Sequence, residues 1–319
     1  MKKLLLLLVI MASALTPGAR AEDYPTKPIR IVVPTPAGSS GDVLTRQYAK
    51  VLTEKLGQSV IVDNRPGANG IIGAQVVAQA PPDGYTLLFA SSQVHTMNPY
   101  LAKDLSFDAQ KDFVPIIVTG RGFAFLLVAA ASPFQSLKEL IAAAKKSPGK
   151  LTFASGGEGS VQHVMGEKMK LMAGIDLNHI PYKGETPAVQ DMMAGQIDLC
   201  FCFPASTMPL VRSGKLRALA VTGEKRFSAF PDIPTMAEAG LAGYYEYTLG
   251  MYLAPRGTPA AIIDKLNDAF RVALLAGKKD MLERGTEFIA GSTQEAAAML
   301  ENEHVRAGKV VKELGLKAQ

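Results

Sequence analysis

The sequence predicts a protein of the α/β class, with helices on both faces of parallel sheets. The first observation is that short apolar, β-branched segments alternate with helical patterns along almost the whole chain. The second is the length, because 319 residues are long for one domain and comfortable for two. The third is the composition: 48% hydrophobic and 20% charged residues are typical of globular proteins and exclude a disordered chain.

The elements are expected in three groups. The first group alternates strand, helix, strand, helix and strand at 29–33, 42–56, 59–62, 71–79 and 86–90. The second has strands at 125–129, 151–154, 179–180, 197–203 and 216–221 and helices at 137–146, 161–172 and 187–194. The last has a strand at 245–253 and helices at 259–275 and 293–314. We expect the final helix to pack back on the first domain through Leu300, Val310, Val311 and Leu314.

Residues at two helix starts support these boundaries. Ser292 and Glu295 fit a capping box, in which the two side chains satisfy free amides of the first turn. Thr258 and Pro259 place a hydroxyl cap before a proline at the first helical position.

The amino terminus has the pattern of a secretory signal. Lys2 and Lys3 precede a dozen apolar residues, and a small-residue cleavage site ends at Ala21. We therefore expect residues 1–21 to be removed and the protein to be exported. No later stretch is long and apolar enough for a membrane span, so no stable membrane anchor is expected. Without residues 1–21, 31 basic and 29 acidic residues remain, and a net charge of +2 gives no support to nucleic-acid binding.

Cys200 and Cys202, the only cysteines, lie two residues apart in an expected strand. Their number excludes both a disulfide scaffold and a four-thiolate zinc site. Residues i and i+2 share one face of a strand, and we expect a bridge between them to strain the bond, so two buried, reduced thiols are predicted. A metal pair would need further ligands nearby, and none is evident. We expect neither a metal nor a cofactor.

Catalytic signatures are sparse. The sequence has no Gly-x-Ser-x-Gly elbow, no His-Glu-x-x-His and no phosphate-binding Gly-x-x-x-x-Gly-Lys. Four scattered histidines, at positions 95, 163, 179 and 304, show no metal-ligand spacing. Ser160 and His163 form a possible nucleophile and base, but three residues apart at a helix start they fit a cap and a packing contact better.

Glycine-rich loops join strands to helices at 34–42 and 156–160. Such loops expose backbone amides at a helix start, where the amides and the aligned peptide dipoles attract anions. Two loops, one from each half, can therefore hold one carboxylate from opposite sides of a cleft. The alternatives are a dinucleotide site, which lacks the required glycine spacing and acidic partner, and two simple tight turns. For a third glycine-rich loop at 66–73, a simple structural turn is expected, with a place in the wall of the cleft as the alternative.

At these positions the chain resembles the Bug family, the periplasmic solute-binding receptors of tripartite tricarboxylate transporters. The matching segments follow in order over the whole mature chain. They include DNRPGANG at 63–70, PDGYTLL at 82–88 and HIPYKG at 179–184, with further matches at 24–34, 194–198, 219–222, 231–235 and 254–259.

The resemblance implies a type II periplasmic binding protein fold, with two α/β lobes around a ligand cleft, joined by two crossover strands. Residues 22–122 and 246–319 would form a discontinuous first domain, and residues 123–245 the second. Ligand-binding positions carried over from the family are Thr35, Ala37, Gly38 and Ser39 in the first loop and Ser155, Gly156, Gly157, Gly159 and Ser160 in the second. Ser91, Ser92 and Gln93 are expected in the cleft wall, and Asp42 fits a helix-start residue better than a ligand contact.

Several departures from the family pattern bear on the ligand. Thr35 stands where an aromatic residue is usual, and the protein contains no tryptophan. Cys202 stands in the distal wall where an acidic or polar residue is common, which would weaken any preference for a ligand amine. We expect a carboxylate without a charged amine, such as a dicarboxylic or hydroxy acid.

The resemblance implies a receptor without enzymatic activity, whose partners are a small organic carboxylate and the membrane permease subunits of a tripartite transporter. The membrane partner would recognise the closed conformation that the lobes adopt around the ligand. Two other functions are possible alternatives to a transport receptor. One is a sensor module that presents its ligand to a membrane kinase, and the other is a periplasmic hydrolase or isomerase with His163 as its base.

Overall fold

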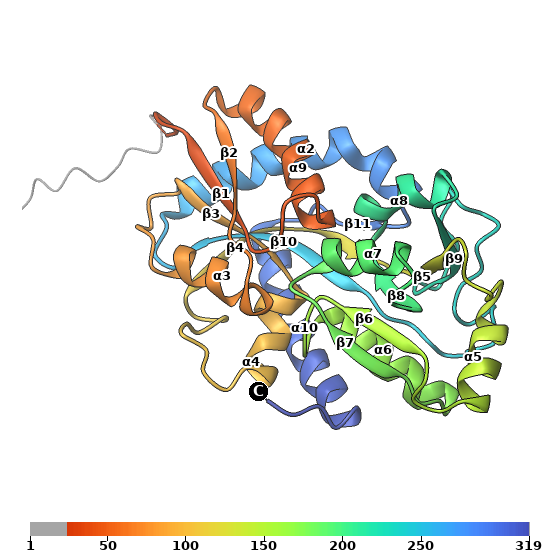
Figure 1. The fold of residues 1–319 in the computed structure, drawn as a ribbon. Coiled ribbons are helices and arrows are strands. Elements are labelled where there is room, and N and C mark those ends of the chain that lie inside the picture. Colours follow the sequence, from red (N-terminus) through yellow and green to blue (C-terminus); the bar gives the residue numbers. More distant parts are fainter. Residues whose placement is uncertain (1–23, 319) are drawn as a thin grey trace, which may run out of the picture.

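The computed structural model describes residues 24–318 (Figure 1). The expected secretory signal at 1–21 therefore lies outside the described residues. Within those residues, no helix is long and apolar enough to cross a membrane.

One sheet has six strands, in the order β11-β4-β10-β3-β1-β2. Its strands are β1 (Ile29–Val33), β2 (Val60–Asn64), β3 (Thr86–Ser91), β4 (Phe113–Gly122), β10 (Thr248–Pro255) and β11 (Glu287–Phe288). β1 pairs in parallel with β2 and β3, whereas β10 runs antiparallel to both β3 and β4. The parallel order predicted for the first group of strands is therefore confirmed for β1, β2 and β3, and the sheet as a whole is mixed because β10 and β11 run in the opposite direction.

The second sheet has five strands, in the order β7-β6-β8-β5-β9. Its strands are β5 (Phe125–Ala129), β6 (Thr152–Ser155), β7 (Asn178–Pro181), β8 (Leu199–Cys202) and β9 (Leu216–Val221). β6 is parallel to β7 and β8, and β5 is antiparallel to β8 and β9. The two sheets occupy opposite halves of the molecule, each with its own helices, which confirms a two-lobed α/β fold (Figure 1).

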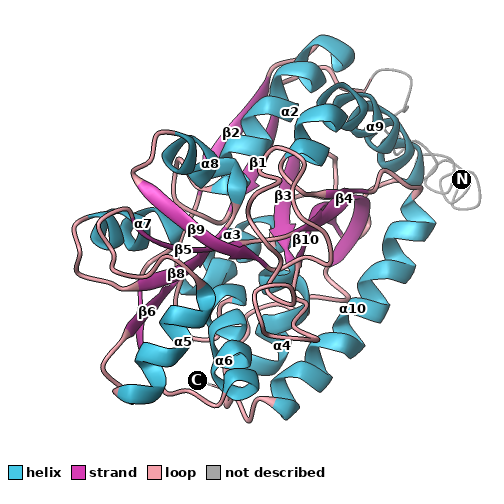
Figure 2. Cartoon of the chain, turned by 90° about the vertical axis from the view of Figure 1, so that its right-hand side faces the viewer, coloured by secondary structure: helices cyan, strands magenta, loops and turns pink. Residues whose placement is uncertain are grey.

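The helices mostly follow the predicted pattern. They are α2 (Ser40–Leu56), η2 (Ala68–Gly70), α3 (Ile71–Ala78), η3 (Gln93–Met97), α4 (Asn98–Leu101), α5 (Leu137–Lys146), α6 (Val161–Ala173), α7 (Glu185–Met193), α8 (Pro204–Arg212), α9 (Ala260–Glu283) and α10 (Thr293–Glu313). α10 runs along one side of the molecule (Figure 2) and contacts η3, α4 and β4, all of which belong to the first half of the chain.

The two predicted caps have different outcomes. At α10, Ser292 Oγ accepts from the amide of Glu295 at 3.2 Å while Glu295 accepts from the amide of Ser292 at 2.7 Å, so the capping box is confirmed. At α9, the cap is Pro259 itself, and the Thr258 hydroxyl donates instead to the carbonyl of Pro255. The predicted Thr258 cap is therefore wrong, because its hydroxyl turns back into the preceding turn.

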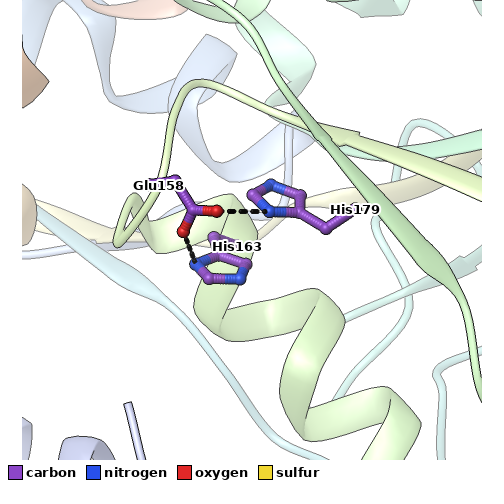
Figure 3. A group of neighbouring side chains, drawn as sticks. All are labelled: Glu158, His163 and His179. Carbon is purple, nitrogen blue, oxygen red and sulfur yellow. Dashed lines mark ion pairs between the residues drawn. The ribbon is translucent and has the colours of Figure 1, made fainter. Parts of the chain in front are cut away.

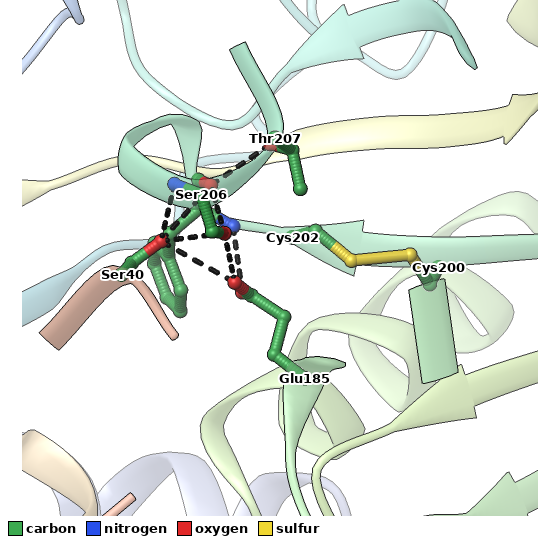
Figure 4. The surroundings of a disulfide bond; sticks show 7 residues. Ser40, Glu185, Cys200, Cys202, Ser206 and Thr207 are labelled. Atoms are coloured by element: carbon green, nitrogen blue, oxygen red, sulfur yellow. Dashed lines mark hydrogen bonds between the residues drawn. A yellow bond between two sulfur atoms is a disulfide. The ribbon is translucent and has the colours of Figure 1, made fainter. Parts of the chain in front are cut away.

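Cys200 and Cys202 form a disulfide (Figure 4). Both side chains are buried on the same face of β8, and their Cα atoms lie 6.0 Å apart, within the range that disulfides span. The prediction of two reduced thiols is therefore wrong, because the shared face that was expected to strain the bond brings the two sulfur atoms together.

Candidate ligand-binding site

A cavity of about 770 Å³ lies between the two halves of the molecule. Its walls come from loops that follow β1, β2 and β3 of one sheet and β6, β7 and β8 of the other. Such loops at the carboxyl ends of strands are where open α/β sheets bind ligands. The predicted site residues that line the cavity are Thr35, Ser39, Ser91, Gln93, Gly156, Gly157 and Ser160.

Two helices, α2 and α6, begin at this cavity with the same arrangement. Each has a serine cap whose hydroxyl accepts from the third amide of the helix: Ser39 from Asp42, and Ser160 from His163. The first two amides of an α-helix have no acceptor within the helix itself. In α2 these belong to Ser40 and Gly41 and in α6 to Val161 and Gln162, and all four residues line the cavity.

The first loop is fixed by its own polar groups. Thr35 and Ser39 share a hydroxyl hydrogen bond of 2.6 Å, and the amide of Gly38 donates to the carboxylate of Asp42 at 2.9 Å. Burial opposes ionisation of Asp42, but hydrogen bonds from Arg46, Gly38 and Asn64 outweigh it and lower its pKa. Asp42 thus orders the loop, and neither Ala37 nor Gly38 lines the cavity.

In the second loop, several predicted amide donors are already engaged. The amide of Gly157 donates to Ser155 Oγ at 3.1 Å, and that of Gly159 donates to His163 Nδ1 at 2.9 Å. Ser155 and Gly159 lie outside the cavity lining. The amides of Gly157 and Gly159 are therefore not available to a ligand, whereas Gly156 and the first turn of α6 line the cavity.

His163 does not face Ser160 as a base would face a nucleophile. Ser160 Oγ accepts from the backbone amide of His163, while the ring Nδ1 accepts from Gly159. This arrangement is the cap and packing contact that the sequence favoured.

The structure brings His163 and His179 together with Glu158, although the sequence shows no ligand spacing (Figure 3). The two rings stack 4.0 Å apart, and the carboxylate of Glu158 lies 3.5 Å from Nδ1 of His179 and 4.0 Å from Nδ1 of His163. Burial is the main cause that lowers the pKa of both histidines, that of His179 to about 4.

A metal ion is not well accommodated by this cluster. Zinc ligands converge within about 2.2 Å of one ion. Here the two rings are stacked and nearly parallel, at 8°, so their nitrogens do not point toward a common centre, and His163 Nδ1 already accepts from an amide. The two rings instead stabilise the second loop, because His163 Nδ1 accepts from the Gly159 amide and His179 Nε2 shares a hydrogen bond with Ser155 Oγ.

A polar contact joins the start of α2 to the second lobe (Figure 4). Ser40 Oγ lies 2.9 Å from Ser206 Oγ and donates to the carbonyl of Phe203 at 3.1 Å. Glu185 accepts from the Phe203 amide at 2.8 Å and from the Ser206 hydroxyl, its Oε1 lies 3.3 Å from Ser40 Oγ, and its burial raises its pKa. A hydrogen bond from Asn69 to the carbonyl of Glu158 is a second link across the cavity. Residues from the two lobes thus meet directly beside the cavity.

Two further predicted wall residues, Ser92 and Cys202, do not line the cavity. Ser92 Oγ accepts from the amide of Leu249 at 2.8 Å, and Cys202 lies in the buried disulfide. The sequence did not reveal Glu185, Ser206 or Arg284. The first two meet Ser40 only through the fold, and Arg284 lies near the end of α9, far in sequence from both loops.

The profile of the family described as "Tripartite tricarboxylate transporter family receptor" matches residues 44–316. The chain belongs to this family. BugT of Bordetella pertussis is 34% identical over 313 residues, which cover 97% of this chain and 95% of BugT. The predicted resemblance to the Bug receptors is therefore confirmed.

Solved structures of receptors agree with this assignment. The Rhodopseudomonas palustris protein Rpa4515, solved with adipate, is 35% identical, with a TM-score of 0.89 over 93% of this chain and all of that protein. MatC of the same species, solved with bound malate, is 29% identical, with a TM-score of 0.83 over 90% of this chain and all of MatC. The family and these neighbours are solute-binding receptors, so the protein is a receptor and not an enzyme.

Proposed function

We propose that this protein is a periplasmic receptor that captures one small organic carboxylate between its lobes and delivers it to the permease subunits of a tripartite tricarboxylate transporter. Residues 1–21 direct export, residues 22–122 with 246–319 form one lobe, and residues 123–245 form the other. The family assignment and the acids bound by Rpa4515 and MatC support a carboxylate ligand and a periplasmic location.

The observation that carries the proposal is the pair of capped helix starts at one cavity. Ser39 and Ser160 satisfy the third amide of their helices, and the first two amides of each helix remain available to a ligand. The positive ends of two helix dipoles add to this attraction for an anion. A hydrogen bond to a charged group contributes about 1.5–3 kcal/mol, so a few such donors hold a carboxylate without an ion pair.

Closure of the lobes links binding to transport in this proposal. One carboxylate that accepts from α2 of one lobe and α6 of the other stabilises only the arrangement in which the two helix starts are close. A ligand shifts such an equilibrium by its difference in affinity for the two arrangements. The contact of Ser40 with Ser206 and Glu185 adds to the closed arrangement, and the closed surface is what the permease would recognise.

A thermal-shift screen of the purified exported protein tests this function, with titration calorimetry for each hit. The panel contains succinate, malate, adipate, hexanoate, glutamate and lysine. We expect stabilisation by acids without an amine, and a ligand at 100 times its Kd adds about 2.7 kcal/mol to the free energy of unfolding. Binding of amino acids alone would contradict the expected ligand class, and binding of none of these acids would contradict the proposed function.

A further inference from the structure

A buried carboxyl group lies where the two lobes meet beside the cavity. Glu185, the first residue of α7, is 7% exposed and contributes to the cavity wall. Its Oε2 accepts from the Phe203 amide at 2.8 Å, while its Oε1 contacts Ser206 Oγ and lies 3.3 Å from Ser40 Oγ. The side-chain amide of Gln162, in the first turn of α6, also donates toward it. Glu185 therefore contacts residues at both of the helix starts that are proposed to hold the ligand.

Glu185 forms no ion pair with any of the described residues. The charged and titratable groups on the elements around it make other contacts or face solvent. They are Asp42 and Arg46 in α2, Glu158 and His163 beside the start of α6, Lys183 before α7, Asp191 within α7, and Arg212 in α8. Burial without a cation disfavours the charged carboxylate, and it raises the pKa of Glu185 despite the hydrogen bonds that oppose this shift.

The contacts of Glu185 suit the neutral acid as well as the carboxylate. In the neutral form, Oε2 still accepts from the Phe203 amide, and a hydroxyl at Oε1 donates to Ser206 Oγ. The hydrogen of Ser206 then turns to the carbonyl of Phe203, which lies 3.2 Å away. Protonation of Glu185 therefore removes a buried charge without leaving one of these polar groups unpaired.

A bound ligand adds a second negative charge close to Glu185. A carboxylate that accepts from the Ser40 amide lies within about 10 Å of the Glu185 carboxyl group, because Ser40 itself contacts that group. This distance is no more than the Debye length at 0.1 M ionic strength, and buried charges are screened less than exposed ones. The bound anion therefore disfavours ionised Glu185 further, whereas in open lobes Glu185 loses Ser40 and is hydrated.

We propose that Glu185 takes up one proton when the receptor closes around its carboxylate ligand and releases it when the lobes open. The proton comes from solvent and adds to the side-chain carboxylate, so that two negative charges are not buried together in the closed cavity. The inference rests on the proposed function and adds to it a pH dependence of capture. Because the complex then binds one more proton than the free receptor and ligand, affinity rises as the pH falls.

Titration calorimetry in two buffers tests the inference. Bis-Tris and Tris differ in ionisation enthalpy, so the binding enthalpies of succinate, malate or adipate at pH 7 in the two buffers give the number of protons taken up. We expect close to one proton per bound acid, and an affinity that falls about 3- to 10-fold for each pH unit from 6.5 to 8. Glu185→Gln has the shape of the neutral acid, so it should bind the same acid without proton uptake and with an affinity that is constant over this range.

Asp191→Asn is the matched control, because it also removes one negative charge from α7 but does not line the cavity, and proton uptake should persist in it. Each protein is measured with the same acid, so titration of the acid itself cancels in the comparison. Binding to the native protein without proton uptake, or uptake that persists in Glu185→Gln, would overturn the role of Glu185 and leave the proposed function intact. Failure of all three acids to bind would overturn both.

Discussion

Substitution of Ser40 separates the contribution of one backbone amide from that of the side chain. Ser40 is the first residue of α2, the position where proline is preferred in helices, and Ser39 has φ −68° and ψ 161°, which suits a residue before proline. Ser40→Pro therefore removes the amide hydrogen without distorting the helix. Ser40→Ala is the matched control, because both variants lose the hydroxyl that contacts Ser206 and Glu185.

The difference between these two variants isolates one amide donor to a bound carboxylate. A hydrogen bond to a charged group contributes about 1.5–3 kcal/mol, which corresponds to a loss of about 10- to 150-fold in affinity. Calorimetry with the acid that binds most tightly measures the ratio of the two dissociation constants, and circular dichroism melting shows that both variants fold. Equal affinities of Ser40→Pro and Ser40→Ala would refute the role of this helix start.

Three further predictions concern stability and covalent structure. Burial and the neighbouring His163 lower the pKa of His179 from 6.5 to about 4, so the unfolded chain binds the proton first and the free energy of unfolding should fall as the pH drops from about 6.5 to about 4. Urea denaturation at pH 7 and pH 5 measures this, and an equal pH dependence in His179→Gln would contradict the assignment. Ser292→Ala breaks the capping box and should cost about 1 kcal/mol in the same assay, whereas an unchanged midpoint would show that the cap contributes nothing. Alkylation of the denatured, unreduced protein should label neither cysteine, and two labelled thiols would exclude the disulfide.

The strands and helices that were predicted are those with an uninterrupted pattern. β1 and β3 are short, mostly apolar runs, and α2 and α6 have clear amphipathic spacing. β4 was missed because Pro115, Gly120 and Gly122 interrupt its pattern, and the strand is defined by its pairing with β10. α8 was missed because it carries one proline at its start and another inside.

The sequence predicts where the site lies but not which backbone amides donate hydrogen bonds in it. Glycine between a strand and a helix correctly indicates a loop at the cavity, since its backbone approaches other groups closely. The sequence does not reveal which amides turn inward, and those of Gly157 and Gly159 are taken by Ser155 and by the ring of His163. Contacts between residues 145 positions apart, such as Ser40 with Glu185, depend on how the two lobes meet and leave no local signal.

A crystal structure of the protein with its tightest-binding acid tests the central claim most directly. We expect one carboxylate to lie within hydrogen-bond distance of the Ser40 or Gly41 amide of α2 and of the Val161 or Gln162 amide of α6. A ligand whose carboxylates contact only one of these helix starts, or neither, would contradict capture between the lobes.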